Sequence, residues 1–459
     1  GCGRLITHHM QIPAAGHQRA GSTRTLMTGA DGSLVKRTVL PGGLRVVSEA
    51  VPGSRSVALG FWVGVGSRDE SPKAAGASHF LEHLLFKGTA RRGPFEIAAA
   101  IEEVGGDLNA FTTKECTCYH ARVLADDMPL AVDVLGDMIT TCRIDPVDVD
   151  SERGVVLEEI AMNEDDYVDV AHQNLSSRLY GSSRLADPVI GTVSSLQQMT
   201  RSTVWRHYRK HYRPSDIVVA AAGAVDHAHL VREVRRVTGA WVTDPAATPT
   251  PARSLRTASA RHRSVPGCEV ISRPTEQAHI MIGVPGYART DDRRWPLAVL
   301  DVALGTGMSS RLFQEVREKR GLVYSVHTFR SGYSDAGMFG IYAGTMPDKA
   351  DTTVDVVQAV LADAAANGMT DDEVARAKGQ LRGASVLESE DPGSRMSRLG
   401  EAEVLSGQLL SLDDVVEEID KVTPEAVAAV ARELLTKPQT LAVVGPYDTD
   451  RSFPNGAAQ

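Results

Sequence analysis

The sequence predicts an α+β fold of two related units, each a mainly antiparallel sheet covered by helices. Both halves of the chain end in the same order of helix, turn and apolar strand, closed by Gly223 and Asp226 in one copy and by Gly445 and Asp448 in the other. Short connections between neighbouring strands favour antiparallel pairing. No Gly-x-Gly-x-x-Gly pattern follows a strand, which disfavours a dinucleotide-binding fold.

A linker separates the two halves. Residues 243–262 contain three prolines among small and polar residues, a composition typical of semi-rigid linkers. We therefore expect a first domain over 36–242, a second over 263–450 and a tail over 451–459. Residues 1–35 are rich in Gly, Ser, Thr and His and lack the apolar segment of a signal peptide, so they are expected to form a flexible leader.

Hydrophobic spacing places the elements of the first unit. Strands are expected at 44–49, 57–65, 108–113, 118–123 and 217–225. Helices are expected at 74–87, which Gly88 would end, and at 129–141. A further helix is expected over 145–160, and 369–384 is its counterpart in the second unit. Both begin with acidic residues, which complement the helix dipole.

Composition excludes several classes of protein. Of the 459 residues, 49 are Lys or Arg and 58 are Asp or Glu, giving a net charge of -9. This balance argues against a nucleic-acid binder, and no apolar run approaches the roughly 18 residues of a membrane span. Five scattered cysteines are too few for a disulfide framework, which favours a cytoplasmic protein with reduced thiols. Cys116 and Cys118 are best interpreted as small residues packed in a sheet.

The strongest chemical signal is an H-x-x-E-H motif formed by His79, Glu82 and His83 on the expected helix. Four residues separate the histidines, so both side chains lie on one face and can reach a single ion. Neutral imidazole is a preferred zinc ligand. Glu82 lies on the neighbouring flank, close enough to contact a metal-bound water without being a ligand.

A catalytic zinc site normally has three protein ligands and one open position. The expected helix after residue 145 offers several carboxylates for the third. Glu152 and Glu159 are seven residues apart and share a face, whereas Glu158 points elsewhere. Most glutamates are solvated surface residues, and spacing alone leaves the third ligand open between Glu152, Glu158 and Glu159.

Several motifs occur together in a characteristic order: HFLEHLLFKGT, NAFTTKECTCY, ERGVVLEEI and SSRLFQEVREKRGLVYSV. In this the chain resembles the pitrilysin (insulinase) metallopeptidases, in particular the short-chain branch of mitochondrial processing peptidase and its bacterial relatives. The resemblance covers Val39 to about Asp448. It implies a fold that forms half of a clamshell, and a zinc-dependent endopeptidase that hydrolyses extended peptides or unfolded segments.

The resemblance also implies roles for particular residues. His79, His83 and Glu159 would bind one Zn²⁺ per chain, and Glu82 would be the general base. Glu152 would support the site from behind the ligands. The substrate would contact Phe86, Asn109 and Ala110, the last two on an edge strand to which an extended peptide adds.

In the second half, the resemblance implies that Arg317 and Tyr324 contact the substrate backbone and the scissile carbonyl. Residues 295–304 hold no histidine and Gln380 aligns with Glu159, so no second metal site is expected. Family members with four such units close like a clamshell, so a two-unit chain is expected to form a homodimer, in a bacterial cytoplasm. The alternative is a non-catalytic or partner-dependent scaffold subunit.

Overall fold

The computed structural model describes residues 11–257 and 262–453, which divide into two compact units. The first takes the described residues up to Glu158 together with Pro188–Thr257 and Leu387–Asp413. The second takes Glu159–Asp187, the described residues from 262 to Val386 and those from Asp414 onward. Neither unit is continuous in sequence, whereas the expected domains, 36–242 and 263–450, were.

The first unit contains a seven-stranded sheet in the order β1-β2-β3-β7-β4-β6-β5. All neighbours pair antiparallel except β3 and β7, which are parallel. The strands are β1 (Thr23–Thr28), β2 (Leu34–Val39), β3 (Arg45–Ala50), β4 (Ser56–Val63), β5 (Asp107–Thr112), β6 (Thr117–Leu124) and β7 (Ile217–Gly223). The order leaves β5 at one edge of the sheet.

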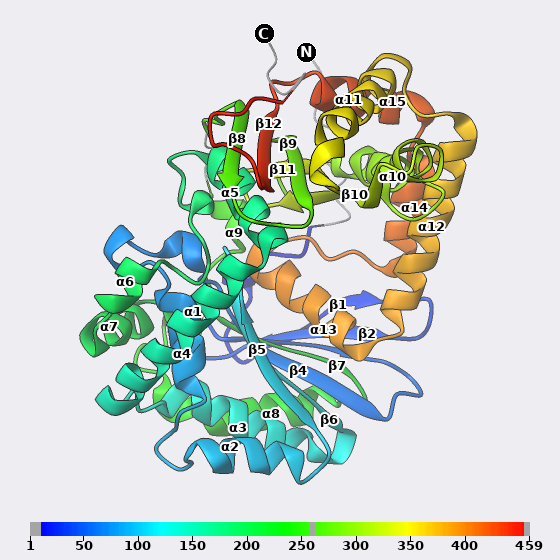
Figure 1. Cartoon of the computed structure of the whole chain (residues 1–459). Coiled ribbons are helices and arrows are strands. Elements are labelled where there is room, and N and C mark those ends of the chain that lie inside the picture. Colours follow the sequence, from blue (N-terminus) through cyan, green and yellow to red (C-terminus); the bar gives the residue numbers. More distant parts are fainter. Residues whose placement is uncertain (1–10, 258–261, 454–459) are drawn as a thin grey trace. The chain divides into compact units, whose positions relative to one another are not determined.

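Helices cover both faces of this sheet (Figure 1). One face packs against α3 and α8, the other against α13. The helices in this unit are α1 (Ala77–Leu85), α2 (Pro94–Glu102), α3 (Met128–Thr141), α6 (Val193–Gln197), α7 (Arg201–His211), α8 (His227–Thr238), α9 (Arg253–Arg256) and α13 (Pro392–Glu401). The long helix α4 (Pro146–Asp165) begins in this unit and ends in the second.

The second unit contains a five-stranded sheet in the order β10-β11-β9-β12-β8. Its strands are β8 (Gly267–Ser272), β9 (Ala278–Pro285), β10 (Val323–Gly332), β11 (Gly337–Thr345) and β12 (Thr440–Gly445). Its helices are α5 (Tyr167–Tyr180), α10 (Arg294–Gly305), α11 (Ala350–Asn367) and α15 (Pro424–Leu435). The helices α12 (Asp371–Ser389) and α14 (Leu412–Lys421) each cross the boundary between the units.

The two sheets share one plan. The order β3-β7-β4-β6-β5 of the first corresponds to β8-β12-β9-β11-β10 of the second, and the single parallel pair, β3·β7 or β8·β12, falls at the same place in each. The prediction of two related units with mainly antiparallel sheets is therefore confirmed. The difference is β1 and β2, which extend the first sheet only.

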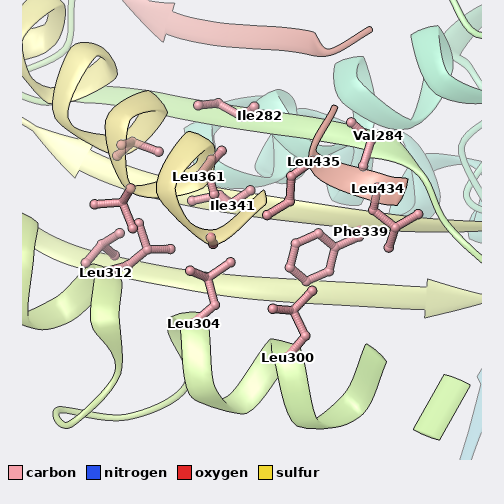
Figure 2. Close-up of a cluster of buried hydrophobic side chains, with 14 of the residues drawn as sticks. Ile282, Val284, Leu300, Leu304, Leu312, Phe339, Ile341, Leu361, Leu434 and Leu435 are labelled. Carbon is pink, nitrogen blue, oxygen red and sulfur yellow. The ribbon is translucent and has the colours of Figure 1, made fainter. Parts of the chain in front are cut away.

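Alternating side chains of the second sheet form two apolar layers. Ile282, Phe339 and Leu441 face one way and belong to one core cluster with Leu300 and Leu434 on the helices of that face. Figure 2 labels four of these residues, Ile282, Phe339, Leu300 and Leu434. The intervening residues Met281, Met338 and Ala442 face the other way and pack against α5. Because strand side chains alternate with period two, the sheet needs helices on both sides.

Each sheet takes one covering helix from the other half of the sequence. The helix α5 follows α4 in the first half but packs on β9 and β12 of the second sheet. The helix α13 follows α12 in the second half but packs on β3, β4 and β7 of the first. This reciprocal exchange is why the compact units differ from continuous halves. Sequence composition carries no signal for it.

Part of the expected leader and part of the expected linker are ordered. Residues Thr23–Thr28 form β1, where Thr23 Oγ1 lies 2.7 Å from Thr38 Oγ1. The strand lies at an edge of the sheet and four of its six residues are exposed, while Leu26 and Met27 pack against a core cluster. Arg253 on α9 is 5% exposed and its guanidinium lies 2.5 Å from Asp69. The remainder of the leader, residues 1–10, and residues 258–261 and 454–459 lie outside the described part.

Cys116 and Cys118 belong to the apolar cluster under α13. Both side chains are buried, and the cluster also contains Trp62, Met396 and Leu399. Burial raises the pKa of the Cys118 thiol well above its ordinary value, so it stays protonated. A packing role accounts for both residues.

A buried ion pair fastens the segment after α13 to the first sheet. The carboxylate of Glu403, 2% exposed, accepts from Arg37 Nη1 at 2.8 Å and Arg45 Nη1 at 3.3 Å. Removing one partner of a buried pair leaves uncompensated charge and costs about 3–5 kcal/mol.

We expect Glu403→Gln to lower the free energy of unfolding by about that amount in urea titrations followed by circular dichroism. Glu233→Gln, which breaks a partly exposed pair with Arg236, should cost at most about 1 kcal/mol. Equal losses would contradict a special role for Glu403.

Candidate metal centre

Helix α1 presents one apolar and one polar side. Phe80, Leu81, Leu84 and Leu85 are fully buried, whereas His79, Glu82 and His83 are half-buried on the other side. The apolar side fixes the rotation of the helix about its axis. The three polar residues of the H-x-x-E-H motif are therefore held at one margin of the core.

The start of α1 is set by Gly76 and Glu70. Gly76 has φ +89°, and a Cβ there would lie 2.6 Å from the carbonyl oxygen of Ile190. Both carboxylate oxygens of the buried Glu70 accept backbone bonds, from Gly76 N and Ser78 N, at 2.7 Å each. A carboxylate at the first turn satisfies unpaired donors and complements the helix dipole. The motif thus begins on a firmly held turn.

The two histidines of α1 and Glu159 of α4 form a cluster. One ligand atom from each lies within 4.8 Å of the others, and the imidazole centroids are 4.7 Å apart. Burial, and secondarily the neighbouring His83, lowers the pKa of His79 to about 4. A neutral imidazole is the form that binds a metal. Within residues 11–257 and 262–453, this is the one group of at least three such side chains.

Glu152 is buried on α4 behind His83. Val149, Glu152, Val156 and Ile160 form the buried stripe of the helix, and within it Glu152 Oε2 lies 3.1 Å from His83 Nδ1. Glu152 Oε1 lies 2.6 Å from Lys87 Nζ. A carboxylate that accepts from Nδ1 fixes the tautomer and leaves Nε2 with its lone pair for a metal. Among the candidates for the third ligand, Glu158 is exposed and Glu159 joins the histidines.

Glu82, next to His83 on α1, contacts the end of the edge strand β5. Its Oε2 accepts a hydrogen bond of 2.5 Å from Thr112 Oγ1 at the end of that strand. Asn109 and Ala110 lie on the same strand, where Asn109 is exposed. Because β5 pairs with β6 alone, its other side presents backbone donors and acceptors. Phe86, just after α1, lies with its ring centroid 6.5 Å from that of Tyr119.

Arg317 and Tyr324 lie together in the second unit. The Arg317 guanidinium is 4.7 Å from the Phe313 ring centroid and 5.6 Å from that of Tyr324. Tyr324 sits where the register of β10 shifts against β11 and is 76% exposed. A bulge redirects a side chain out of the regular pattern, which here leaves a large aromatic residue largely in solvent.

Three contributors to the site escaped sequence reasoning: Glu70, Lys87 and Thr112. Glu70 accepts two backbone bonds at the start of α1, Lys87 forms an ion pair with Glu152, and Thr112 donates to Glu82. Of the three, only Thr112 could have been suggested by the sequence, because its spacing from Ala110 places both side chains on one face of the strand. Nothing in the sequence shows that this face meets Glu82.

The fold and the cluster define a two-unit α+β protein in which α1 and α4 bring together three candidate metal ligands. The family model described as Insulinase (Peptidase family M16) matches residues 45–193, and the model described as Peptidase M16 inactive domain matches residues 198–381. Together they span well over half of the chain. The chain therefore belongs to the insulinase family, peptidase family M16, as the sequence motifs indicated.

Bacterial relatives match the chain over nearly their whole length. An uncharacterized zinc protease of Streptomyces coelicolor is 51% identical over 92% of each chain. One of Mycobacterium tuberculosis is 46% identical over 91% of this chain and 95% of its own. An uncharacterized zinc protease of Bacillus subtilis is 37% identical over 90% of this chain and 98% of its own. These relatives are of the short-chain type.

Solved structures share the fold. A protease from Helicobacter pylori matches with a TM-score of 0.81 at 19% identity, over 89% of this chain and 98% of its own. A peptidase M16 inactive domain from Pseudomonas fluorescens matches with a TM-score of 0.79 at 21% identity, over 94% of this chain and 100% of its own. Both confirm the α+β architecture. Among the described residues, no helix is long and apolar enough to cross a membrane.

The bond between Glu152 and His83 generates a prediction about metal affinity. Partners that orient a metal-binding histidine typically contribute about 10- to 100-fold in affinity. We expect Glu152→Ala to weaken Zn²⁺ binding by that factor in competition titrations with a chromophoric chelator. Glu158→Ala, an exposed glutamate on the same helix, is the matched control and should bind like the wild type. Unchanged affinity in Glu152→Ala would contradict the supporting role.

Proposed function

We propose that the chain is a zinc-dependent endopeptidase that hydrolyses peptide bonds in extended peptides or unfolded protein segments. The observation that carries this proposal is that ligand atoms of His79, His83 and Glu159 lie within 4.8 Å of one another. Glu82, which is not part of this group, lies next to His83 in the sequence. Relatives at 37–51% identity that bear the name zinc protease support it.

The donor set fits zinc. Two imidazoles and one carboxylate are a common set in catalytic zinc sites, where the fourth position stays open. The buried Glu152 holds His83 in the ligating tautomer. When bound, zinc lowers the pKa of a coordinated water and polarises a carbonyl. We propose one such site per chain, formed by α1 and α4.

In this proposal Glu82 is the general base. Its place next to His83, with its carboxylate held by Thr112, suits a group that accepts a proton from the attacking water and later delivers it to the leaving amine. Proton transfer by a positioned side chain contributes typically about 10²- to 10⁴-fold to the rate. Glu152, already engaged by His83 and Lys87, orients a ligand instead.

The edge strand β5 suits the binding of an extended peptide. Main-chain pairing along an edge gives affinity for varied sequences, with side-chain pockets adding selectivity. Asn109 and Ala110 are placed on this strand, and Phe86 would line the pocket that follows the scissile bond. The substrate class is therefore polypeptide in an extended conformation.

We propose further that two chains form a homodimer in which Arg317 and Tyr324 of one chain complete the metal centre of the other. The exposure of Tyr324 and its contact with Arg317 support a role toward a group outside their own unit. A tyrosine hydroxyl can donate to the oxyanion that forms during hydrolysis, and loss of such a donor costs about 10²- to 10³-fold in rate.

Separating metal binding from chemistry tests the proposal. Glu82→Gln should keep the wild-type zinc content and lose about 10²-fold or more in kcat, since it removes the base and no ligand. His79→Ala and Glu159→Gln should lower the zinc content as well. Zinc is measured by atomic emission and turnover by cleavage of a quenched peptide library. A wild-type chain that binds zinc and cleaves nothing would favour the scaffold-subunit alternative.

Mixing two inactive chains tests the dimer. Glu82→Gln and Tyr324→Phe should each be nearly inactive as homodimers. With random assembly about half of the dimers are mixed, and each of these holds one intact centre out of two, so co-expression should restore about a quarter of wild-type activity. Differential tags report the mixed dimers. Their presence without recovered activity would show that Tyr324 does not serve the partner's metal centre.

A further inference from the structure

Thr112 carries the contact between the edge strand and the motif helix. Its hydroxyl donates to Glu82 Oε2 at 2.5 Å, a length typical of a charge-assisted O–H···O⁻ bond. We propose that Thr112 is a positioning residue that fixes the direction of the Glu82 carboxylate for proton transfer. This inference rests on the proposed function, in which Glu82 is the base.

The backbone holds the Thr112 hydroxyl in place. Thr112 is the last residue of β5 and pairs with Thr117 at the start of β6. Its β-branched side chain has restricted χ1 freedom. The donor therefore sits on a rigid strand while the acceptor sits on a long side chain with three rotatable bonds. In such a pair the strand orients the glutamate.

Neighbouring hydroxyls at this end of the sheet serve the backbone. Thr113 Oγ1 donates to the Cys116 carbonyl at 3.1 Å and Thr117 Oγ1 to the Val65 carbonyl at 2.9 Å. Both bonds stabilise the local turn and strand ends. Thr112, in contrast, directs its hydroxyl to the one acidic side chain of α1. The contrast between adjacent threonines argues against a purely structural role for Thr112.

Holding one carboxylate oxygen restricts rotation of the whole group. The glutamate terminus otherwise rotates broadly about its last torsion, and a base must meet its proton at about 2.6–3.2 Å. A misplacement of 1 Å at a reacting group can cost about 100-fold in rate. Loss of the Thr112 hydroxyl should therefore reduce kcat while leaving substrate affinity and metal ligands intact.

Three variants test this role. In Thr112→Val we expect kcat to fall about 10- to 100-fold, with unchanged KM and unchanged zinc content. Thr112→Ser keeps the hydroxyl and should restore most of kcat. Thr117→Val removes a hydroxyl from the paired residue and should leave kcat unchanged, whatever it does to stability. Wild-type kcat in Thr112→Val, no rescue by Ser, or loss of zinc in Thr112→Val would each overturn the inference.

A second readout measures the hydrogen bond without turnover. In metal-free protein, the free energies of unfolding of Thr112→Val, Glu82→Ala and the double variant, from urea titrations, form a double-mutant cycle. We expect a smaller loss in the double variant than the sum of the single losses, and additive losses would overturn the inference. Thr112→Ala serves if the valine variant does not fold. Turnover of Glu82→Gln, measured alongside, distinguishes the two failures. An active Glu82→Gln variant would contradict the proposed function. An inactive Glu82→Gln variant beside a fully active Thr112→Val variant would contradict the role of Thr112 alone.

Discussion

The site depends on the contacts of one buried carboxylate: Glu152 forms an ion pair with Lys87 and accepts a hydrogen bond from His83 Nδ1. Glu152 is 3% exposed, and a buried carboxylate is stable only when its oxygens are satisfied. His83 and Lys87 supply one partner for each oxygen. These contacts join α1 to α4, so the helix that carries Glu159 is held against the helix that carries both histidines. The geometry of the cluster follows from that one buried charge.

Much of this arrangement was accessible from sequence, because helical periodicity is local. The four-residue spacing of His79 and His83 and the seven-residue spacing of Glu152 and Glu159 each define a helix face. What spacing could not decide is which glutamate approaches the histidines. That depends on the rotation of α4, and Val149, Val156 and Ile160 set it by burying one stripe. The stripe includes Glu152, which leaves Glu159 at its margin.

The exchange of α5 and α13 between the two halves could not be predicted from the sequence. The positions of strands and helices along the chain follow from local patterns, and the two halves share a five-strand order. Which sheet a helix covers depends on the path of the chain after α4 and α12, and an amphipathic helix fits either apolar face equally well by composition. The same holds for β1, whose pairing rests on backbone bonds to β2. Tertiary choices of this kind leave no trace in residue periodicity.

The second unit has the same core fold as the first without its histidine motif. It builds the same five-strand order as the first, yet α10 is buried along almost its whole length, from Leu297 to Gly305, and carries no histidine. Gln380 on α12, which the family resemblance aligns with Glu159, carries an amide and no carboxylate. A fold that forms without the ligands in one copy does not need a metal to form in the other. The group formed by His79 and His83 of α1 with Glu159 of α4 is therefore an addition to a scaffold that forms without it.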